Sequence, residues 1–138
     1  MGLAERRRIA DIKENKLPKF QEQLNEACGF DLPFEFKIDS LPEDTTVLDC
    51  FDFYIDSLGP GLVVSLMREL CKDAIGKKAA KAAIKKVVFV NTAKSPEDKG
   101  EKSFSLKDGT LKISCSFYGY SDLLYSQEEL LPLVEALL

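Results

Sequence analysis

The hydrophobic residues of this chain follow two different periods, which predict helices in some segments and strands in others. From residue 3 to residue 28 they recur every three or four positions, the period of an amphipathic helix, and Gly29 follows as a left-handed helix cap. Pro18 lies inside this segment and removes one backbone hydrogen bond. We therefore expect either a kink or a second helix that begins at Pro18.

A period of two predicts the first strand, over 34–38, where apolar and charged side chains alternate. Pro33 cannot donate a hydrogen bond to a neighbouring strand, so this strand either lies at a sheet edge or begins after the proline. The uninterrupted apolar run at 87–90 is typical of a strand with no solvated side. It predicts a central strand, 87–91, that is buried on both faces.

The clearest local pattern is a β-hairpin over 103–107 and 110–117. Asp108 and Gly109 form a two-residue connection that suits the positive φ angles of a type I′ turn. This turn fixes the register and places four large side chains on one face. The pairs that it implies are Leu106 with Leu111 and Phe104 with Ile113.

The helical period returns between the first two strands. The segment 61–75 lies between Pro60, near its first turn, and Gly76, just past its end, which is the usual punctuation of a helix. A helix over 47–58 is also predicted, with an inner face formed by Leu48, Phe51, Ile55 and Leu58.

Two further helices follow from composition and capping. The segment 77–85 has an alanine face and a lysine face, so we expect it to pack closely against a neighbour. The segment 127–137 follows a capping box made by Ser126 and Glu129, and its apolar end is expected to dock on the core. Because Pro132 interrupts this register, the helix proper begins either at the cap or near Pro132.

The order of these elements predicts one α+β domain over residues 1–138. We expect an antiparallel sheet of about four strands, packed with helices on one face. The predicted strands are 34–38, 87–91, 103–107 and 110–117, and the predicted helices are 3–28, 47–58, 61–75, 77–85 and 127–137.

Composition limits the classes of partner. A hydrophobic content of 45% with 30% charged residues is typical of a globular domain. The formal net charge of −4 disfavours nucleic acid and anionic membrane surfaces, which both require cationic protein surface. The charged amino terminus lacks the apolar centre of a secretory signal, and no apolar run is long enough to span a bilayer. We therefore expect a cytoplasmic protein without a membrane partner.

The chain contains no histidine, so the commonest general base and metal ligand are both absent. No phosphate-binding glycine loop or nucleophile motif is present either. The four cysteines contain no C-x-x-C pair and lie on predicted apolar faces, so small core thiols are expected, and two disulfides are the alternative. They are Cys28, Cys50, Cys71 and Cys115. We predict no cofactor and no metal, and the pattern favours a protein without enzymatic activity.

Three stretches carry a resemblance to known proteins. The segments 17–41, 71–92 and 104–113 resemble a family of small uncharacterised bacterial proteins. The motifs in these stretches are structural, namely a helix stop, an edge strand, an alanine-lysine helix and a turn. The resemblance implies a compact bacterial cytoplasmic domain, and it implies no catalytic residue because the family has no assigned activity.

Three groups of side chains are candidates for function. Asp49, Asp52 and Asp56 share the face opposite the apolar stripe of 47–58, where they form a solvated face, meet a basic partner protein or hold a hard cation such as Mg²⁺. Tyr118 and Tyr120 lie on a glycine-containing segment, a composition common in recognition loops. The lysine set forms either a solvated surface or a contact for a polyanion or an acidic partner, and consists of Lys77, Lys78, Lys81, Lys85 and Lys86.

These features favour a non-catalytic protein-interaction module, such as an adaptor, a chaperone or an immunity-type inhibitor. Its predicted partner-binding residues are Asp49, Asp52, Asp56, Tyr118 and Tyr120. A partner that meets the aspartates would be basic. The alternative is a metal-assisted hydrolase or phosphotransferase that uses the clustered aspartates.

Overall fold

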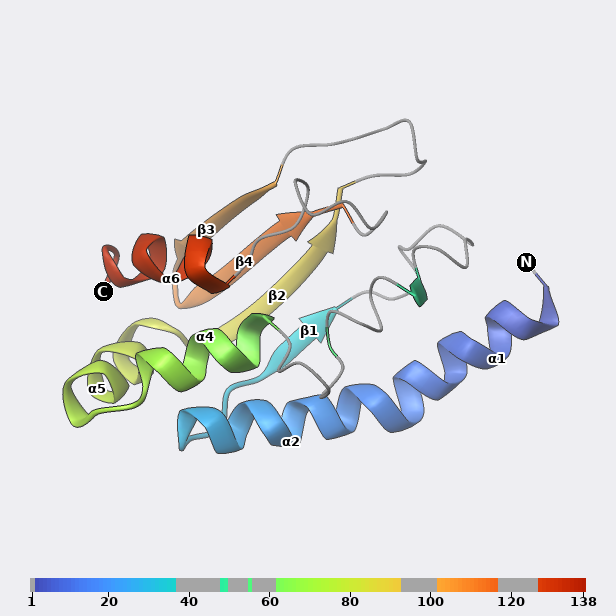
Figure 1. Cartoon of the computed structure of the whole chain (residues 1–138), viewed down its shortest axis with the longest axis horizontal. Helices are drawn as coiled ribbons and strands as arrows, with labels where there is room; N and C mark the ends of the chain where they lie inside the picture. Colours follow the sequence, from blue (N-terminus) through green and yellow to red (C-terminus); the bar gives the residue numbers. More distant parts are fainter. Residues whose placement is uncertain (1, 37–47, 50–54, 56–61, 93–101, 117–126) are drawn as a thin grey trace.

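The computed structural model describes residues 2–36, 48–49, 55, 62–92, 102–116 and 127–138. They form helices and a four-stranded sheet, so the predicted α+β class is confirmed. In Figure 1 the helices α4 and α6 lie on one face of the sheet, and α2 runs alongside β1.

The amino-terminal helix is continuous through Pro18. It consists of α1 (Leu3–Asp11), a π-helical segment η1 (Ile12–Lys16) and α2 (Leu17–Cys28), which run end to end in Figure 1. Pro18 is the second residue of α2, which directly follows η1. Proline has no N–H to donate, so the regular α-helical hydrogen-bond pattern is interrupted at Pro18. The wider π turn before it changes the hydrogen-bond register at this point. Gly29 closes α2 as predicted, with φ 75° and an N–H that donates to the Asn25 carbonyl at 2.9 Å.

Two amide side chains of α2 hold the chain that leads into the first strand. Gln21 donates to the Leu32 carbonyl at 2.6 Å and accepts from the Phe34 N–H at 2.8 Å. Asn25 accepts from the Leu32 N–H at 2.8 Å. These bonds satisfy backbone groups that have no strand partner, so they fix the position of β1 on α2.

The sheet is formed by β1 (Phe34–Phe36), β2 (Lys86–Asn91), β3 (Ser103–Lys107) and β4 (Thr110–Cys115), in the order β1-β2-β4-β3. β1 and β4 both pair with β2 in parallel, and only β3 and β4 pair antiparallel. The predicted antiparallel sheet is therefore wrong. The helices between β1 and β2 return the chain to the end of the sheet where β1 began, so β2 runs parallel to β1. β3 runs in the opposite direction at the far edge, and β4 turns back between β3 and β2, so β4 is parallel to β2.

The local strand predictions are mostly correct. β1 begins after Pro33 and lies at a sheet edge, and β2 is an inner strand. The hairpin has the predicted register, with positive φ at Asp108 (52°) and Gly109 (80°). Burial of β2 on both faces is wrong, because Val87 and Phe89 are buried whereas the intervening Val88 is only half-buried.

The helices α4 (Leu62–Leu70) and α5 (Ala74–Ala83) meet at a different place from the one predicted. Gly76 lies in the first turn of α5 and does not follow the end of α4. A Cβ atom at this position would lie 1.9 Å from the Leu70 carbonyl oxygen. The glycine is therefore required by close packing between the two helices.

The last helix, α6 (Gln127–Glu135), includes Pro132 and so begins well before the proline. Its docking on the core is partial, because Leu130 and Val134 are buried whereas Leu133 and Leu137 are exposed. The Lys102 ammonium donates to the Glu129 carboxylate at 2.8 Å and links α6 to the chain before β3.

The core fills the space between the helices and one face of the sheet. Phe34 of the edge strand β1 is partly buried and packs against this core, with ring centroids 4.8 Å from Phe20 of α2 and 5.1 Å from Phe89 of β2, both edge to face. Leu48 and Ile55 are buried, in agreement with the inner face predicted for 47–58. Apart from Asp49, the rest of that segment lies outside the described residues, as do residues 37–38 of the first predicted strand and residue 117.

Candidate interaction surface on the open face of the sheet

The side of the sheet away from the core, here called the open face, is set by the strand register. Side chains that pair across neighbouring strands point to the same side of a sheet, and successive residues alternate between the two sides. The open face thus receives Glu35 from β1, Lys86, Val88 and Val90 from β2, Thr110, Lys112 and Ser114 from β4, and Ser103, Ser105 and Lys107 from β3.

A groove of about 440 Å³ lies on the open face. Val88 and Val90 are half-buried and supply its apolar side chains, next to polar groups from all three parallel strands. The lining residues are Glu35, Val88, Phe89, Val90, Asn91, Thr110 and Lys112. The face becomes less accessible toward the carboxyl end of β4, where Ser114 is 9% exposed. The groove therefore combines an apolar floor with a polar rim, the usual chemistry of a recognition surface.

The open face is locally basic although the whole chain is acidic. Lys86 forms an ion pair with Glu35 at 2.5 Å, which compensates its charge. Lys107 and Lys112 are exposed and form no ion pair with another described residue. Three lysines thus face one glutamate on the described part of this surface, which favours an acidic ligand.

The aspartate face predicted from the sequence is described only at Asp49. This residue is exposed and forms an ion pair with Arg8 of α1. The contact joins the amino-terminal helix to the helical residues 48–49, and as an exposed ion pair it should contribute less than about 1 kcal/mol. Asp52, Asp56, Tyr118 and Tyr120 lie outside the described residues.

The predicted lysine set divides between two surfaces. Lys77, Lys78 and Lys81 of α5 are exposed, whereas Ala80 of the same helix is buried. Lys85 donates to the Lys81 carbonyl at 2.7 Å. Lys86 belongs instead to β2 and to the open face, because α5 ends at Ala83 and the strand begins at Lys86.

The described cysteines are free thiols. Cys28 and Cys115 are buried as expected, whereas Cys71 is half-buried and hydrogen-bonded to Cys28. Burial and the neighbouring Cys71 thiol raise the pKa of Cys28 from 9.0 to about 12. Within the described ranges no three potential ligands among cysteine, aspartate and glutamate come together to hold a metal ion.

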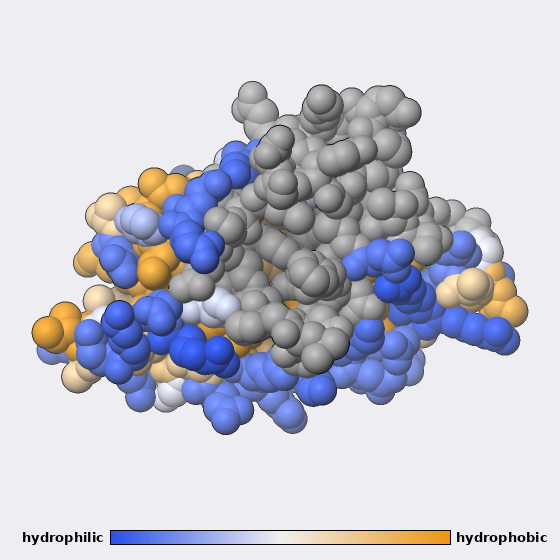
Figure 2. Space-filling model, viewed as in Figure 1, coloured by the Kyte–Doolittle hydropathy of each residue, from blue (hydrophilic) through white to orange (hydrophobic). Residues whose placement is uncertain are grey.

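Exposed apolar residues also lie at the end of the molecule that contains α5 and α6. Figure 2 shows hydrophobic residues there and hydrophilic residues over most of α1 and α2. Ile75 is 83% exposed, and Leu133, Leu137 and Leu138 of the chain end are 45%, 54% and 39% exposed.

Sequence reasoning missed the open face because its apolar residues lie in an uninterrupted apolar run. The available signal was the alternation in the partner strand, where Thr110 and Lys112 alternate with Leu111 and Ile113. A parallel neighbour of such a strand has one solvated side, even when its own sequence is apolar throughout.

Comparisons with protein-family models, with curated proteins and with solved structures found no match to this chain. The helices of the described part are too short or too polar to traverse a lipid bilayer.

Proposed function

We propose that this chain is a non-catalytic protein-interaction module that binds an acidic, extended segment of a partner protein on the open face of its sheet. The observation that carries the proposal is the groove over Val88 and Val90, which is bordered by Lys112 and lies near Lys107. An extended segment matches such a surface because every second side chain points toward it and can contact the valines, while the long lysine side chains at the border can reach acidic side chains along the segment.

Electrostatics supports an acidic occupant more than a basic one. An acidic side chain near Lys112 gains a charge partner, whereas a basic one meets like charge. The groove is small compared with a standard protein interface, so we expect weak binding, with a Kd on the order of 100 μM for an isolated peptide. Contacts outside the groove would be needed for tighter binding.

The aspartates and tyrosines predicted from the sequence are a second proposed contact with the same partner. Asp52, Asp56, Tyr118 and Tyr120 carry this part of the proposal, since Asp49 is paired with Arg8. A basic region of the partner would meet the two aspartates. No observation in the described part favours the metal-assisted hydrolase or phosphotransferase, so we do not propose it.

A peptide-binding measurement with charge-exchanged probes tests the proposal. A short peptide of alternating glutamate and valine should bind the full chain more tightly than the same peptide with lysine in place of glutamate. Lys112→Glu should weaken binding of the glutamate peptide about tenfold and strengthen binding of the lysine peptide. Added salt should reduce the difference between the two peptides.

Lys78→Glu is the matched control, because it makes the same charge change on α5, away from the groove. Equal affinity of both peptides, or an equal effect of the two substitutions, would exclude the open face as the binding surface. For the second contact, charge reversal at Asp52 and Asp56 should weaken binding of the native partner without changing binding of the glutamate peptide.

A further inference from the structure

The carboxyl end of α2 and the turn between α4 and α5 bring two thiols together. Cys28 is the last residue of α2 and is 1% exposed, and Cys71 directly follows α4 and is half-buried. Their side chains are hydrogen-bonded to each other, although 42 residues lie between them in the sequence and no C-x-x-C motif marks them.

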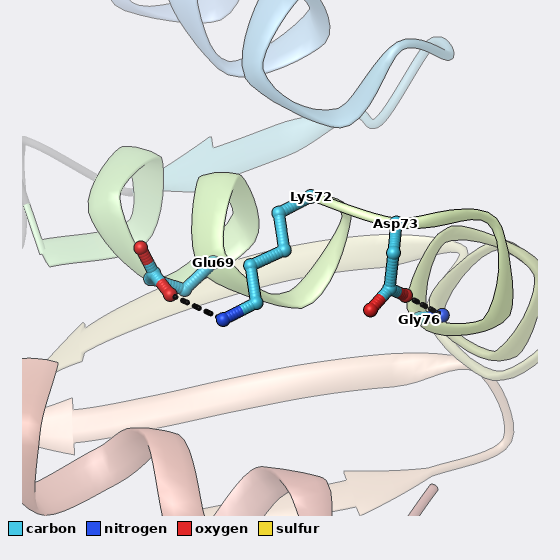
Figure 3. Close-up of polar contacts among 4 residues, drawn as sticks. All are labelled: Glu69, Lys72, Asp73 and Gly76. Atoms are coloured by element: carbon cyan, nitrogen blue, oxygen red, sulfur yellow. Dashed lines mark hydrogen bonds and ion pairs between the residues drawn. The ribbon is translucent and has the colours of Figure 1, made fainter.

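The backbone around Cys71 is held by local polar contacts, which Figure 3 shows. Lys72 forms an ion pair with Glu69 at 3.3 Å, and the Asp73 carboxylate caps α5 by accepting from the Gly76 N–H at 2.7 Å. The Cys71 N–H donates to the Met67 carbonyl at 2.9 Å. These contacts order the turn on both sides of Cys71.

A cation lies beside this pair. The Lys77 ammonium is close enough to Cys71 to favour its thiolate, and it also lies next to Gly29, the residue after Cys28. Burial raises the pKa of Cys71, whereas the hydrogen bond from Cys28 and the charge of Lys77 lower it, with a net increase. Cys71 is thus the more accessible of the two thiols, and the Cys28 hydrogen bond and the Lys77 charge offset part of the effect of burial on its pKa.

We propose that Cys28 and Cys71 form a reversible thiol-oxidation site that hydroperoxides convert to a disulfide between α2 and the α4–α5 turn. In the first step the Cys71 thiolate attacks an oxygen of hydrogen peroxide, so that an S–O bond forms, the O–O bond breaks and hydroxide leaves to be protonated to water. Cys71 becomes a sulfenic acid.

In the second step the Cys28 sulfur attacks the Cys71 sulfur. The S–S bond forms, the S–O bond breaks, and the hydroxyl group leaves with the Cys28 proton as water. The two thiols together lose two electrons, and the peroxide is reduced to two molecules of water. The two thiols already form a hydrogen bond with each other, and the sulfurs must move closer to reach the disulfide bond length of about 2.05 Å.

Peroxide treatment of the full chain followed by peptide mapping tests this site. The reduced protein is treated with hydrogen peroxide, and the remaining thiols are alkylated under denaturing conditions. The expected product is a Cys28–Cys71 cross-linked peptide that disappears after reduction with dithiothreitol. The oxidised protein should have a higher melting temperature than the reduced one, because the disulfide restricts the unfolded chain.

Single-thiol variants separate the roles of the two residues. In Cys28→Ala, peroxide should leave Cys71 as a sulfenic acid that dimedone captures, whereas Cys71→Ser should leave Cys28 unmodified. Lys77→Gln should slow the reaction about twofold, which is the expected net effect of a lower thiolate fraction and a more basic sulfur. Lys78→Gln, the neighbouring exposed lysine, should leave the rate unchanged.

The wild-type result alone decides the proposal, even if a variant fails to fold. Recovery of both Cys28 and Cys71 as alkylated thiols after peroxide treatment would overturn it. So would a disulfide of either residue with Cys50 or Cys115 in equal yield, since that would indicate pairing through the unfolded chain.

Discussion

The two faces of the sheet are built from the same four strands but differ in chemistry. On the core face Val87, Leu111 and Ile113 are each 0% exposed, and helices cover them. On the open face the neighbouring residues Lys112 and Val88 remain accessible and border a groove. Successive residues of a strand point to opposite faces of the sheet. Along β2 and β4, residues that stabilise the fold therefore alternate with residues that are accessible to a partner.

The largest expected difference between the faces is the effect of truncating neighbouring side chains of β4. Ile113→Ala should lower the free energy of unfolding by about 2 to 5 kcal/mol, because it leaves a cavity in the core. Lys112→Ala should change it by less than about 0.5 kcal/mol. Urea unfolding of both variants measures the difference, and similar losses would mean that the open face is packed like the core.

A second expected effect is the pH dependence of stability that arises from the buried thiol of Cys28. Since burial and Cys71 raise its pKa from 9.0 to about 12, the folded chain holds this proton more tightly than the unfolded chain. Its contribution to stability is complete below pH 9.0 and is lost as the pH rises toward about 12. The loss should be about 1.4 kcal/mol per pH unit in this range.

The variant Cys28→Ala isolates this contribution from the lysines and tyrosines that titrate in the same range. Urea unfolding of the reduced protein at about pH 8 and about pH 10 should show a steeper loss for the wild type than for the variant. Parallel losses would show that the Cys28 thiol titrates as it does in the unfolded chain.

A smaller difference is expected between two adjacent valines of β2. Val87→Thr places a hydroxyl in the core and should cost about 1 to 3 kcal/mol, whereas Val88→Thr should cost less than about 0.5 kcal/mol. The two substitutions have the same shape and the same strand preference. Equal costs in thermal unfolding would restore the sequence-based expectation that β2 is buried on both faces.

The smallest effect on stability is expected on the open face itself. Glu35→Gln removes the exposed ion pair with Lys86 and should change stability by less than about 1 kcal/mol. It also removes the only acidic side chain from the described part of this face, so binding of the glutamate-valine peptide should improve about twofold. Weaker peptide binding by this variant would contradict the proposed charge preference.

The features predicted correctly from the sequence are those set by neighbouring residues. Asp108 and Gly109 define the hairpin turn, and Gly29 ends α2 in the left-handed conformation, because both depend on local φ angles. The parallel pairing of β1 with β2 depends on how the chain crosses over between the strands, which no local pattern records. Gly76 was misplaced for a similar reason, since its contact with the Leu70 carbonyl is tertiary.

The candidate site was harder to predict than the fold. Val88 and Val90 lie in an apolar run of the kind that is usually buried. The sequence also shows no boundary between the lysine-rich helix and Lys86, the first residue of β2. The Cys28–Cys71 pair joins two helix ends that are distant in sequence. Each of these groupings arises from strand register or helix packing, so side-chain chemistry alone does not reveal it.

The open face as a binding surface is tested most directly by mapping amide chemical shifts of the ¹⁵N-labelled full chain during titration with the glutamate-valine peptide. The account predicts that the largest changes occur at Val88, Val90, Thr110 and Lys112, and that core-face residues of α4 and α6 change little. Changes centred on α5 or on the exposed chain end, or no saturable changes at all, would contradict it.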